Sequence, residues 1–197
     1  MVGRREMLLD AAIRVVGERG IRALTHRAVD VEAGLGVGST TNYFPTRESL
    51  LAGMVERFAD RERQNFEDLA ISVVPTSPAA LGRALGAAVR DSTRRHRALT
   101  LSRYVLLVES ANNPVLREQM AVTGARVNAW MSTWLRAVGS PDPDRHMHVI
   151  GNYVVGLVLH ELAMPAPDFD PTDSIVMLLE SLITEDPQRA AETTIRR

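Results

Sequence analysis

The chain has 197 residues, which is enough for one substantial domain or for a small domain joined to a larger one. Its 45% hydrophobic and 24% charged residues are ordinary for a globular protein, and no long apolar run predicts a transmembrane helix. The formal net charge of -1 excludes a protein that coats nucleic acid with its whole surface, so any contact with DNA must use a local patch. The absence of cysteine excludes disulfides and thiolate chemistry and favours a cytoplasmic location.

Helical signals dominate the first quarter of the chain. The first helix is indicated by apolar residues that recur on one helical face and by a glycine placed to end it: Leu8, Ala11, Ala12, Val15 and Gly20. Thr25 is expected to cap a short second helix, and a short third helix is expected over residues 37–44. Thr46 is expected to cap a fourth helix that continues toward Leu69.

Later helices are marked by dipeptides in which an N-cap residue precedes a proline: Ser77-Pro78, Asn113-Pro114 and Asp170-Pro171. They predict helices over residues 78–97, 114–138 and 171–183. Two further helices are expected over residues 98–110 and 144–163. Since no segment shows sustained strand alternation, the predicted fold is all-α with about nine helices.

The segment 20–51 contains two helices that are too short to be stable alone. They are joined through Ala33-Gly34-Leu35, and Gly34 can take the positive φ that a tight turn requires. Two short helices with such a turn, supported by a longer helix on each side, are typical of a helix-turn-helix. A Gly-x-Gly-x-Gly-Ser run from Gly34 to Ser39 follows no strand, which argues against a nucleotide site.

From about Arg5 to Leu51 the sequence resembles the N-terminal domain of the TetR family of bacterial regulators. The resemblance rests on ordered features of this segment: Ala11-Ala12, Gly20, Thr25, Ala33-Gly34, Tyr43-Phe44, Arg47-Glu48 and Leu50-Leu51. It implies a helix-turn-helix DNA-binding domain over residues 1–50 and a helical ligand-binding and dimerisation domain over residues 51–185. A polar tail is expected over residues 186–197.

The resemblance also implies which residues face DNA: Arg27, Val37, Gly38, Ser39, Thr41, Asn42, Tyr43, Thr46 and Arg47. Asn42 suits base reading because a carboxamide can pair bidentately with adenine. Thr46 and Arg47, at the start of a helix, are expected to hold a phosphate. Phe44 is expected to lie in the core, whereas Tyr43 can serve either the core or the DNA surface.

Two residues depart from the family pattern. The family usually has a small apolar residue where Asp30 stands and commonly has Tyr where Thr41 stands. A buried and unpaired Asp30 would be costly. We therefore expect either altered packing of the second helix or an Asp30 side chain that caps a neighbouring backbone group.

The last two predicted helices carry apolar residues on more than one face. In 144–163 one stripe contains Met147, Ile150, Val154 and Leu157, and another contains Val149, Tyr153 and Gly156. A helix that is apolar on two sides is buried on two sides. We expect a homodimer through residues 144–163 and 171–183, with a monomer in which these helices are central as the alternative.

Polar residues interrupt the apolar helices of the larger domain, as in a mostly apolar pocket with a few orienting groups. The candidate ligand-binding residues are Tyr104, Glu109, Trp130 and Asn152. Tryptophans such as Trp130 and Trp134 are more often core than pocket wall, and a histidine such as His160 is more often a satisfied or interface residue than a ligand contact.

No metal site, cofactor or catalytic residue is expected, because His146 and His148 point to different sides of a helix and no nucleophile motif occurs. The resemblance to the TetR family implies a regulator, most simply a repressor that binds a pseudo-palindromic operator and is released by a small apolar or aromatic effector. A helical-bundle enzyme or a protein-binding adaptor is the alternative. A regulator requires specific double-stranded DNA, whereas an enzyme or an adaptor does not.

Overall fold

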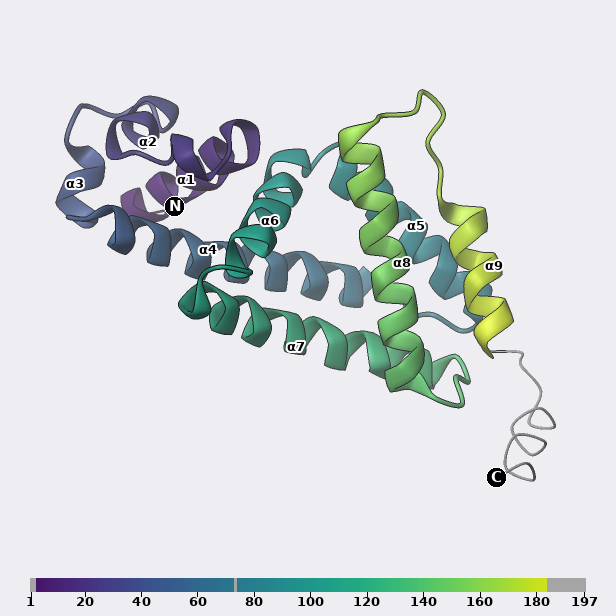
Figure 1. Ribbon diagram of the computed structural model, residues 1–197. Coiled ribbons are helices and arrows are strands. Elements are labelled where there is room, and N and C mark those ends of the chain that lie inside the picture. The colour runs from purple at the N-terminus through teal and green to yellow at the C-terminus, as the bar shows by residue number, and fades with distance from the viewer. Residues whose placement is uncertain (1–2, 73, 184–197) are drawn as a thin grey trace. The chain divides into compact units, whose positions relative to one another are not determined.

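The computed structural model describes residues 3–72 and 74–183 (Figure 1). Over this range the chain forms nine α-helices and one 3₁₀ turn: α1 (Arg4–Arg19), η1 (Ile21–Ala23), α2 (His26–Glu32), α3 (Ser39–Tyr43), α4 (Arg47–Ser72), α5 (Pro78–Thr93), α6 (Arg97–Ser110), α7 (Pro114–Ala137), α8 (Pro143–Ala163) and α9 (Thr172–Ile183). The prediction of an all-helical fold is confirmed. The expected polar tail at 186–197 lies outside the described residues.

The capping residues expected at three helix starts accept the expected hydrogen bonds. The side chain of Thr25 accepts from the backbone N–H of Ala28 at 3.1 Å at the start of α2. Ser77 and Asn113 do the same for α5 and α7, each with an oxygen 3.1 Å from the backbone nitrogen three residues ahead. These local hydrogen bonds explain why the starts of these helices could be located from sequence.

The fifth helix ends earlier than expected, at Thr93 instead of residue 97. The backbone N–H of His96 donates to the carbonyl of Asp91 at 2.9 Å, a bond that spans one residue more than the helical ladder. The chain therefore turns before α6, which begins at Arg97. No glycine or proline marks this turn, so its place was not visible in the sequence.

The chain divides into two compact units, residues 1–72 with 91–127 and residues 73–90 with 128–197. We refer to them as unit 1 and unit 2 and describe each by itself. α4 is continuous from Arg47 to Ser72, so it crosses the domain boundary expected at residue 50. That boundary stays a prediction.

Unit 1 is built around an apolar core to which α1, α2, α4, α6 and the start of α7 contribute. The core consists of Leu8, Leu9, Ala11, Ala12, Ile13, Val16, Leu24, Val29, Phe44, Leu50, Met54, Val55, Phe58, Leu106 and Leu116. Burial of each large side chain stabilises the fold by about 1.5–3 kcal/mol. Because Phe44 and Leu50 belong to this core, both ends of the link between α3 and α4 are anchored in it.

An ion pair also joins α1 to α4. Arg57 and Arg61 lie one turn apart on α4, and each donates two hydrogen bonds to the carboxylate of Asp10, over 2.8–3.2 Å. Burial raises the pKa of Asp10, but the hydrogen bonds from the two guanidinium groups outweigh it and hold the pKa below its ordinary value. This clamp orients α1, which packs against both α2 and α4.

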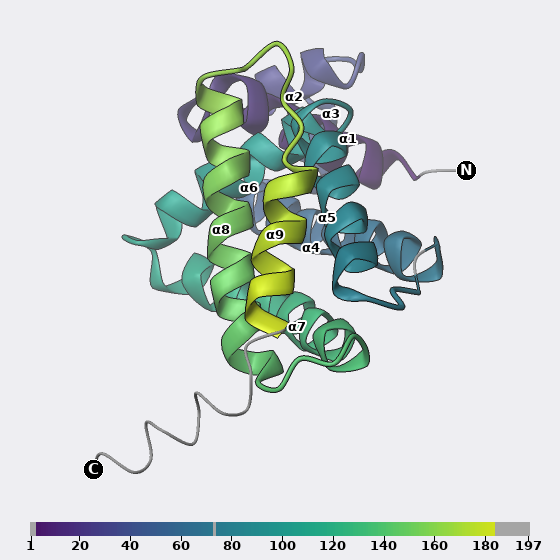
Figure 2. The same cartoon turned by 90° about the vertical axis from the view of Figure 1, so that its right-hand side faces the viewer.

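In unit 2, α5 and α9 approach closely. A Cβ on Gly82 would lie 2.6 Å from Val176 and one on Gly86 would lie 2.4 Å from Thr172, so only glycine fits at these positions without a shift. Arg90 of α5 bonds both Asp170 and Thr172 at 2.5 Å. Figure 2 shows α8 and α9 side by side in this unit.

The turn from α7 to α8 lies between the helices expected over residues 114–138 and 144–163. Gly139 has φ of 91°, and the hydroxyl of Ser140 bonds Nδ1 of His146 at 2.8 Å in a buried position. Asp142 caps α8 by accepting from the N–H of Arg145 at 3.2 Å. None of the described helices is long and apolar enough to cross a membrane.

Candidate nucleic-acid interface

The segment expected to form a helix-turn-helix has that structure. The helices α2 and α3 are joined by residues 33–38, in which Gly34 and Gly38 have φ of 66° and 91°. The N–H of Leu35 donates to the carbonyl of Asp30 at 2.9 Å and closes the turn on α2. The positive φ expected at Gly34 is confirmed, and Gly38 is a second position where a side chain would be strained.

Asp30 is buried, and its side chain caps backbone groups. This was one of the two alternatives expected from the sequence. The Oδ2 of Asp30 accepts from the N–H of Gly38 at 2.8 Å, and its Oδ1 accepts from the N–H of Thr40 at 2.7 Å and from the hydroxyl of Thr40 at 2.5 Å. Burial raises the pKa of Asp30, but the hydrogen bonds from Thr40 and Gly38 outweigh it, so the pKa lies below its ordinary value. The carboxylate therefore stays ionised at the start of α3.

Sequence reasoning did not identify Thr40 as a functional residue. It is fully buried in α3, where its hydroxyl donates to Asp30. The sequence did contain a hint of this pair: Asp30 and Thr40 are polar residues at positions where the helical pattern predicts buried side chains.

The end of α3 is held by α2 as well. His26 Nε2 lies 2.6 Å from the carbonyl oxygen of Phe44, and because a carbonyl can only accept, Nε2 carries the proton. Phe44 is buried, as expected, and the guanidinium of Arg5 lies 5.3 Å from the centre of its ring. Tyr43, for which both roles were open, is 45% exposed.

The start of α4 has a reciprocal cap. The hydroxyl of Thr46 accepts from the N–H of Ser49 at 3.1 Å, and the hydroxyl of Ser49 accepts from the N–H of Thr46 at 3.1 Å. The expectation that Thr46 caps this helix is confirmed. Arg47 is exposed and donates to the carbonyl of Ile21 at 2.9 Å, which fixes its side chain against η1.

Most residues predicted to face DNA lie on the surface. Exposed positions are Arg27, Val37, Thr41, Asn42, Tyr43, Thr46 and Arg47, and half-buried positions are Gly38 and Ser39. The hydroxyl of Ser39 donates to the carbonyl of Gly36 at 2.7 Å, and the N–H of Gly38 is used by Asp30. DNA contact by each of these residues stays a prediction.

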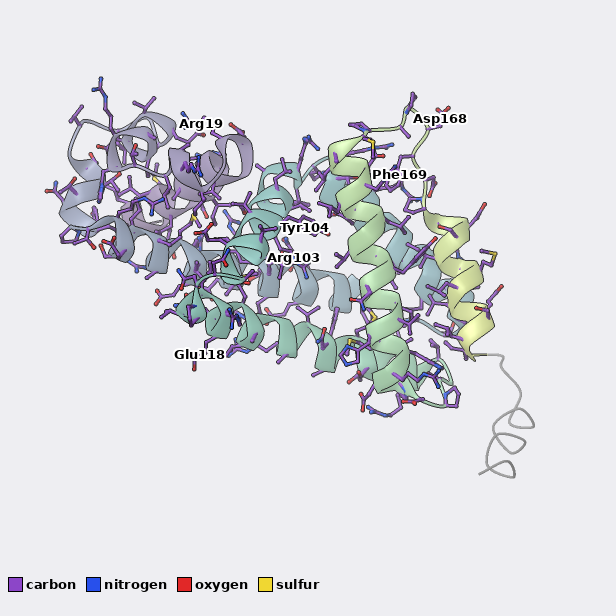
Figure 3. All side chains as sticks on the ribbon, viewed as in Figure 1. Arg19, Arg103, Tyr104, Glu118, Asp168 and Phe169 are labelled. Atoms are coloured by element: carbon purple, nitrogen blue, oxygen red, sulfur yellow. The ribbon has the colours of Figure 1, made fainter. Side chains whose placement is uncertain are left out.

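The four predicted ligand-binding residues fall in both units. In unit 1, Tyr104 is buried on α6 (Figure 3), where burial raises the pKa of its hydroxyl. Glu109 is exposed on the same helix. In unit 2, Trp130 is half-buried, with its ring centre 4.0 Å from that of the buried Trp134, and Asn152 is exposed on α8. Their role in binding stays a prediction.

Unit 1 also contains an open cavity of about 270 Å³. It is lined by Asp10, Ile13, Arg14, Arg61, Asn65, Arg95, His96, Ala98 and Leu99, and by none of the four predicted ligand-binding residues. Throughout the described part of the chain, no group of three or more His, Asp or Glu side chains is placed to hold a metal ion.

Comparison with known proteins decides what this arrangement is. The profile of bacterial regulatory proteins of the tetR family matches residues 8–54, and the profile of the tetracyclin repressor-like C-terminal domain matches residues 76–197. The chain belongs to the TetR family. It is therefore a helix-turn-helix transcriptional regulator with a TetR-type C-terminal domain, and this family is not one of enzymes.

Two curated TetR-family relatives match the N-terminal part of the chain. The HTH-type transcriptional regulator PksA of Bacillus subtilis is 32% identical over 68 residues, which cover 34% of this chain and 33% of PksA. The HTH-type transcriptional repressor KstR2 of Rhodococcus jostii is 40% identical over 58 residues, 29% of this chain and 28% of KstR2. The chain thus spans about a third of the length of the curated relatives it matches.

Solved structures extend the similarity to the C-terminal domain. The multidrug binding protein EbrR in complex with ethidium superposes with a TM-score of 0.66 at 25% identity. The superposition covers 92% of this chain and 99% of EbrR, so it includes both the helix-turn-helix and the TetR-type C-terminal domain.

Proposed function

We propose that this regulator is a repressor that occupies a pseudo-palindromic DNA operator as a homodimer and leaves it when a small apolar or aromatic effector binds. The observation that carries the proposal is the division of α3 into two faces. Thr41, Asn42 and Tyr43 are exposed, whereas Thr40 and Phe44 are buried. A short helix held by the core with polar side chains outward is what reading of base edges in the major groove requires. The relative KstR2 is a transcriptional repressor.

A surface stripe on α8 supports the homodimer. Seven exposed residues follow the i, i+3, i+4, i+7 pattern of one helical face: Val149, Asn152, Tyr153, Gly156, Leu159, His160 and Ala163. A Cβ built on Gly156 meets no atom within 4 Å, so this surface has room for a closely packed partner helix. An exposed helical face that is mostly apolar is typical of an interface between copies, and two copies can hold two reading helices about 34–36 Å apart.

The effector is proposed from the composition of the C-terminal domain and from EbrR, which binds ethidium, a planar aromatic cation. Trp130 has the partly buried aromatic surface on which such a molecule would stack. Tyr104, Glu109 and Asn152 stay candidates from the sequence. The effector releases DNA only by its difference in affinity for the two conformations of the dimer. DNA binding also implies a cytoplasmic location.

The DNA part of the proposal is tested by selecting sequences from a random pool of double-stranded DNA and measuring mobility shifts with the enriched pool. The expected result is an enriched palindromic sequence that the protein binds specifically. Arg47→Ala should weaken this binding, whereas the matched control Arg126→Ala removes an exposed arginine on α7 and should not. If no sequence is enriched, the proposed function is wrong.

The effector part is tested by tryptophan fluorescence in the absence of DNA, with ethidium as the probe. Both tryptophans of the chain lie on α7, so their emission reports on this helix alone. Trp134 remains as a reporter in Trp130→Phe, with its ring centre 4.0 Å from that of residue 130. Saturable quenching with a clearly weaker apparent affinity in Trp130→Phe would support contact at Trp130, and equal apparent affinities would exclude that residue.

A further inference from the structure

The helix α3 has little stability of its own. It contains only five residues, Ser39–Tyr43, and an isolated helix of that length does not form in water. Its N-cap residue is Gly38, which has no side chain to accept from the first free N–H groups of the helix. The position of the reading helix must therefore be set by groups outside it.

Asp30 of α2 supplies the missing cap. An N-cap side chain ordinarily accepts from the second or third N–H of its own helix. Here the Oδ1 of Asp30 accepts from the N–H of Thr40, the second residue of α3, and its Oδ2 accepts from the N–H of Gly38. The cap has moved from residue 38 to the preceding helix, and it ties the start of α3 to α2 by charge-assisted hydrogen bonds.

His26 of α2 holds the opposite end. Its Nε2–H donates to the carbonyl of Phe44, the residue that follows α3. His26 and Asp30 are four residues apart on one helix, so they lie on the same face of α2. One face of α2 therefore grips both ends of α3, about one helical turn apart.

We propose that His26 and Asp30 form a polar clamp that positions α3 for base reading, so that operator specificity depends on two residues that do not themselves read bases. The inference rests on the proposed DNA-binding function. The clamp proposal goes beyond that function because it predicts that substitutions away from the DNA-facing side of α3 change the specificity of DNA binding. Buried Thr40 belongs to the clamp as the partner of Asp30, whereas exposed Asn42 belongs to the reading surface.

The main test compares Asp30→Asn with wild type on the selected operator and on unrelated DNA. The amide keeps the shape of the carboxylate but places an N–H₂ group against an N–H donor. We expect specific affinity to fall about 10- to 100-fold, as for a lost hydrogen bond to a charged group. Affinity for unrelated DNA and its salt dependence should stay unchanged, because the arginines that contact phosphate are intact.

Asp60→Asn is the matched control. Asp60 is an exposed residue of α4, and this substitution changes the charge of unit 1 by the same amount. It should bind the operator like wild type. An equal loss in both variants would show that charge alone is responsible, which would overturn the clamp.

Two further substitutions keep the proposal testable if Asp30→Asn folds poorly. Thr40→Val removes the hydroxyl bond but leaves the backbone bonds to Asp30, so a smaller loss of specificity is expected. His26→Ala should lose specificity, and His26→Gln, which retains an N–H donor, should recover part of it. A simple packing role would not be rescued in this way.

The possible outcomes separate the clamp from the function on which it rests. If wild type binds no specific sequence, the proposed function fails. If wild type binds specifically and Asp30→Asn, Thr40→Val and His26→Ala bind equally well, the clamp fails alone. The clamp also fails if these variants lose affinity for the operator and for unrelated DNA in equal proportion, and if that loss follows their loss of thermal stability.

Discussion

Gly17 of α1 lies directly against the start of α6: a Cβ at this position would be 2.0 Å from the carbonyl oxygen of Ala98 and 2.8 Å from its carbonyl carbon. Both residues belong to unit 1, and α1 also carries the ion pair to α4. The helix that supports the DNA-reading segment therefore packs backbone to backbone on α6. No side chain can be inserted there unless one of the two helices moves.

Gly17→Ala is accordingly expected to destabilise the protein, although alanine favours helix formation more than glycine does. The added methyl group meets rigid backbone, and overpacking of this kind costs about 1–3 kcal/mol. Thermal unfolding at fixed protein concentration would measure the loss. Gly124→Ala on α7 is the control, because its Cβ meets nothing within 4 Å, and it should be neutral or stabilising by up to about 1 kcal/mol. Equal stability of wild type and Gly17→Ala would contradict this close packing.

The ion pair of Asp10 with Arg57 and Arg61 predicts that the free energy of unfolding depends on pH in the acid range. The pKa of Asp10 is lowered in the folded state, so its contribution is fully present above the unfolded pKa near 3.8 and is lost as the pH falls through the folded pKa. Asp10→Asn should reduce the free energy of unfolding by about 2 kcal/mol at neutral pH. The difference from wild type should shrink under strongly acidic conditions. Urea unfolding across this range checks it, and a difference that is independent of pH would argue against the clamp.

The stability contribution of Glu62 is expected to change with pH in the direction opposite to that of Asp10. Glu62 is buried on α4, with Oε2 3.3 Å from Nη1 of Arg103 on α6 (Figure 3), and burial raises its pKa more than Arg103 and His96 lower it. Ionisation therefore costs folding free energy as the pH rises from the ordinary glutamate range through the raised pKa. Glu62→Gln should be at least as stable as wild type at neutral pH, with its relative advantage lost in acid. Unfolding at several pH values decides this, and a variant much less stable at neutral pH would show that the ion pair is net favourable.

The proposed dimer interface on α8 can be tested with one charge. Leu159 is 49% exposed on the apolar stripe, and Leu159→Arg should convert the dimer to monomers, since an unpaired charge at a packed interface is strongly unfavourable. Val122→Arg is the control, because Val122 is 55% exposed on α7, outside the stripe. Sedimentation velocity measures both. A dimeric Leu159→Arg would place the interface elsewhere.

Base reading and phosphate contact are expected to respond differently to substitution. Asn42→Ala should lower affinity for the operator by about 1–3 kcal/mol and relax the preference at one base pair. Arg27→Ala should weaken binding to all sequences alike and reduce the slope of log affinity against log salt by about 1. Fluorescence anisotropy with the selected operator, its single-base variants and several salt concentrations distinguishes them. A uniform loss in Asn42→Ala would remove it from the set of base readers.

The outcome at Asp30 illustrates how far sequence reasoning reached into the site. The cost of burying a carboxylate predicted that Asp30 either disturbs the packing or caps a backbone group, and the second alternative is confirmed. Its partner Thr40 and the matching contact of His26 with Phe44 were not predicted. Both join residues on different helices, and no spacing rule within one helix reveals such contacts.

The sequence by itself determined the all-helical class, the helix starts at Thr25, Ser77 and Asn113, and the helix-turn-helix, because caps, prolines and positive-φ glycines act within a few residues. The early end of α5 at Thr93 was visible only in the structure. Tertiary packing decided the close contact of Gly17 with Ala98 and the hydrogen bonds by which α2 holds both ends of α3. These features depend on which backbone and side-chain groups meet when helices pack. That is set by the shape of the whole core and not by the pattern of any one segment.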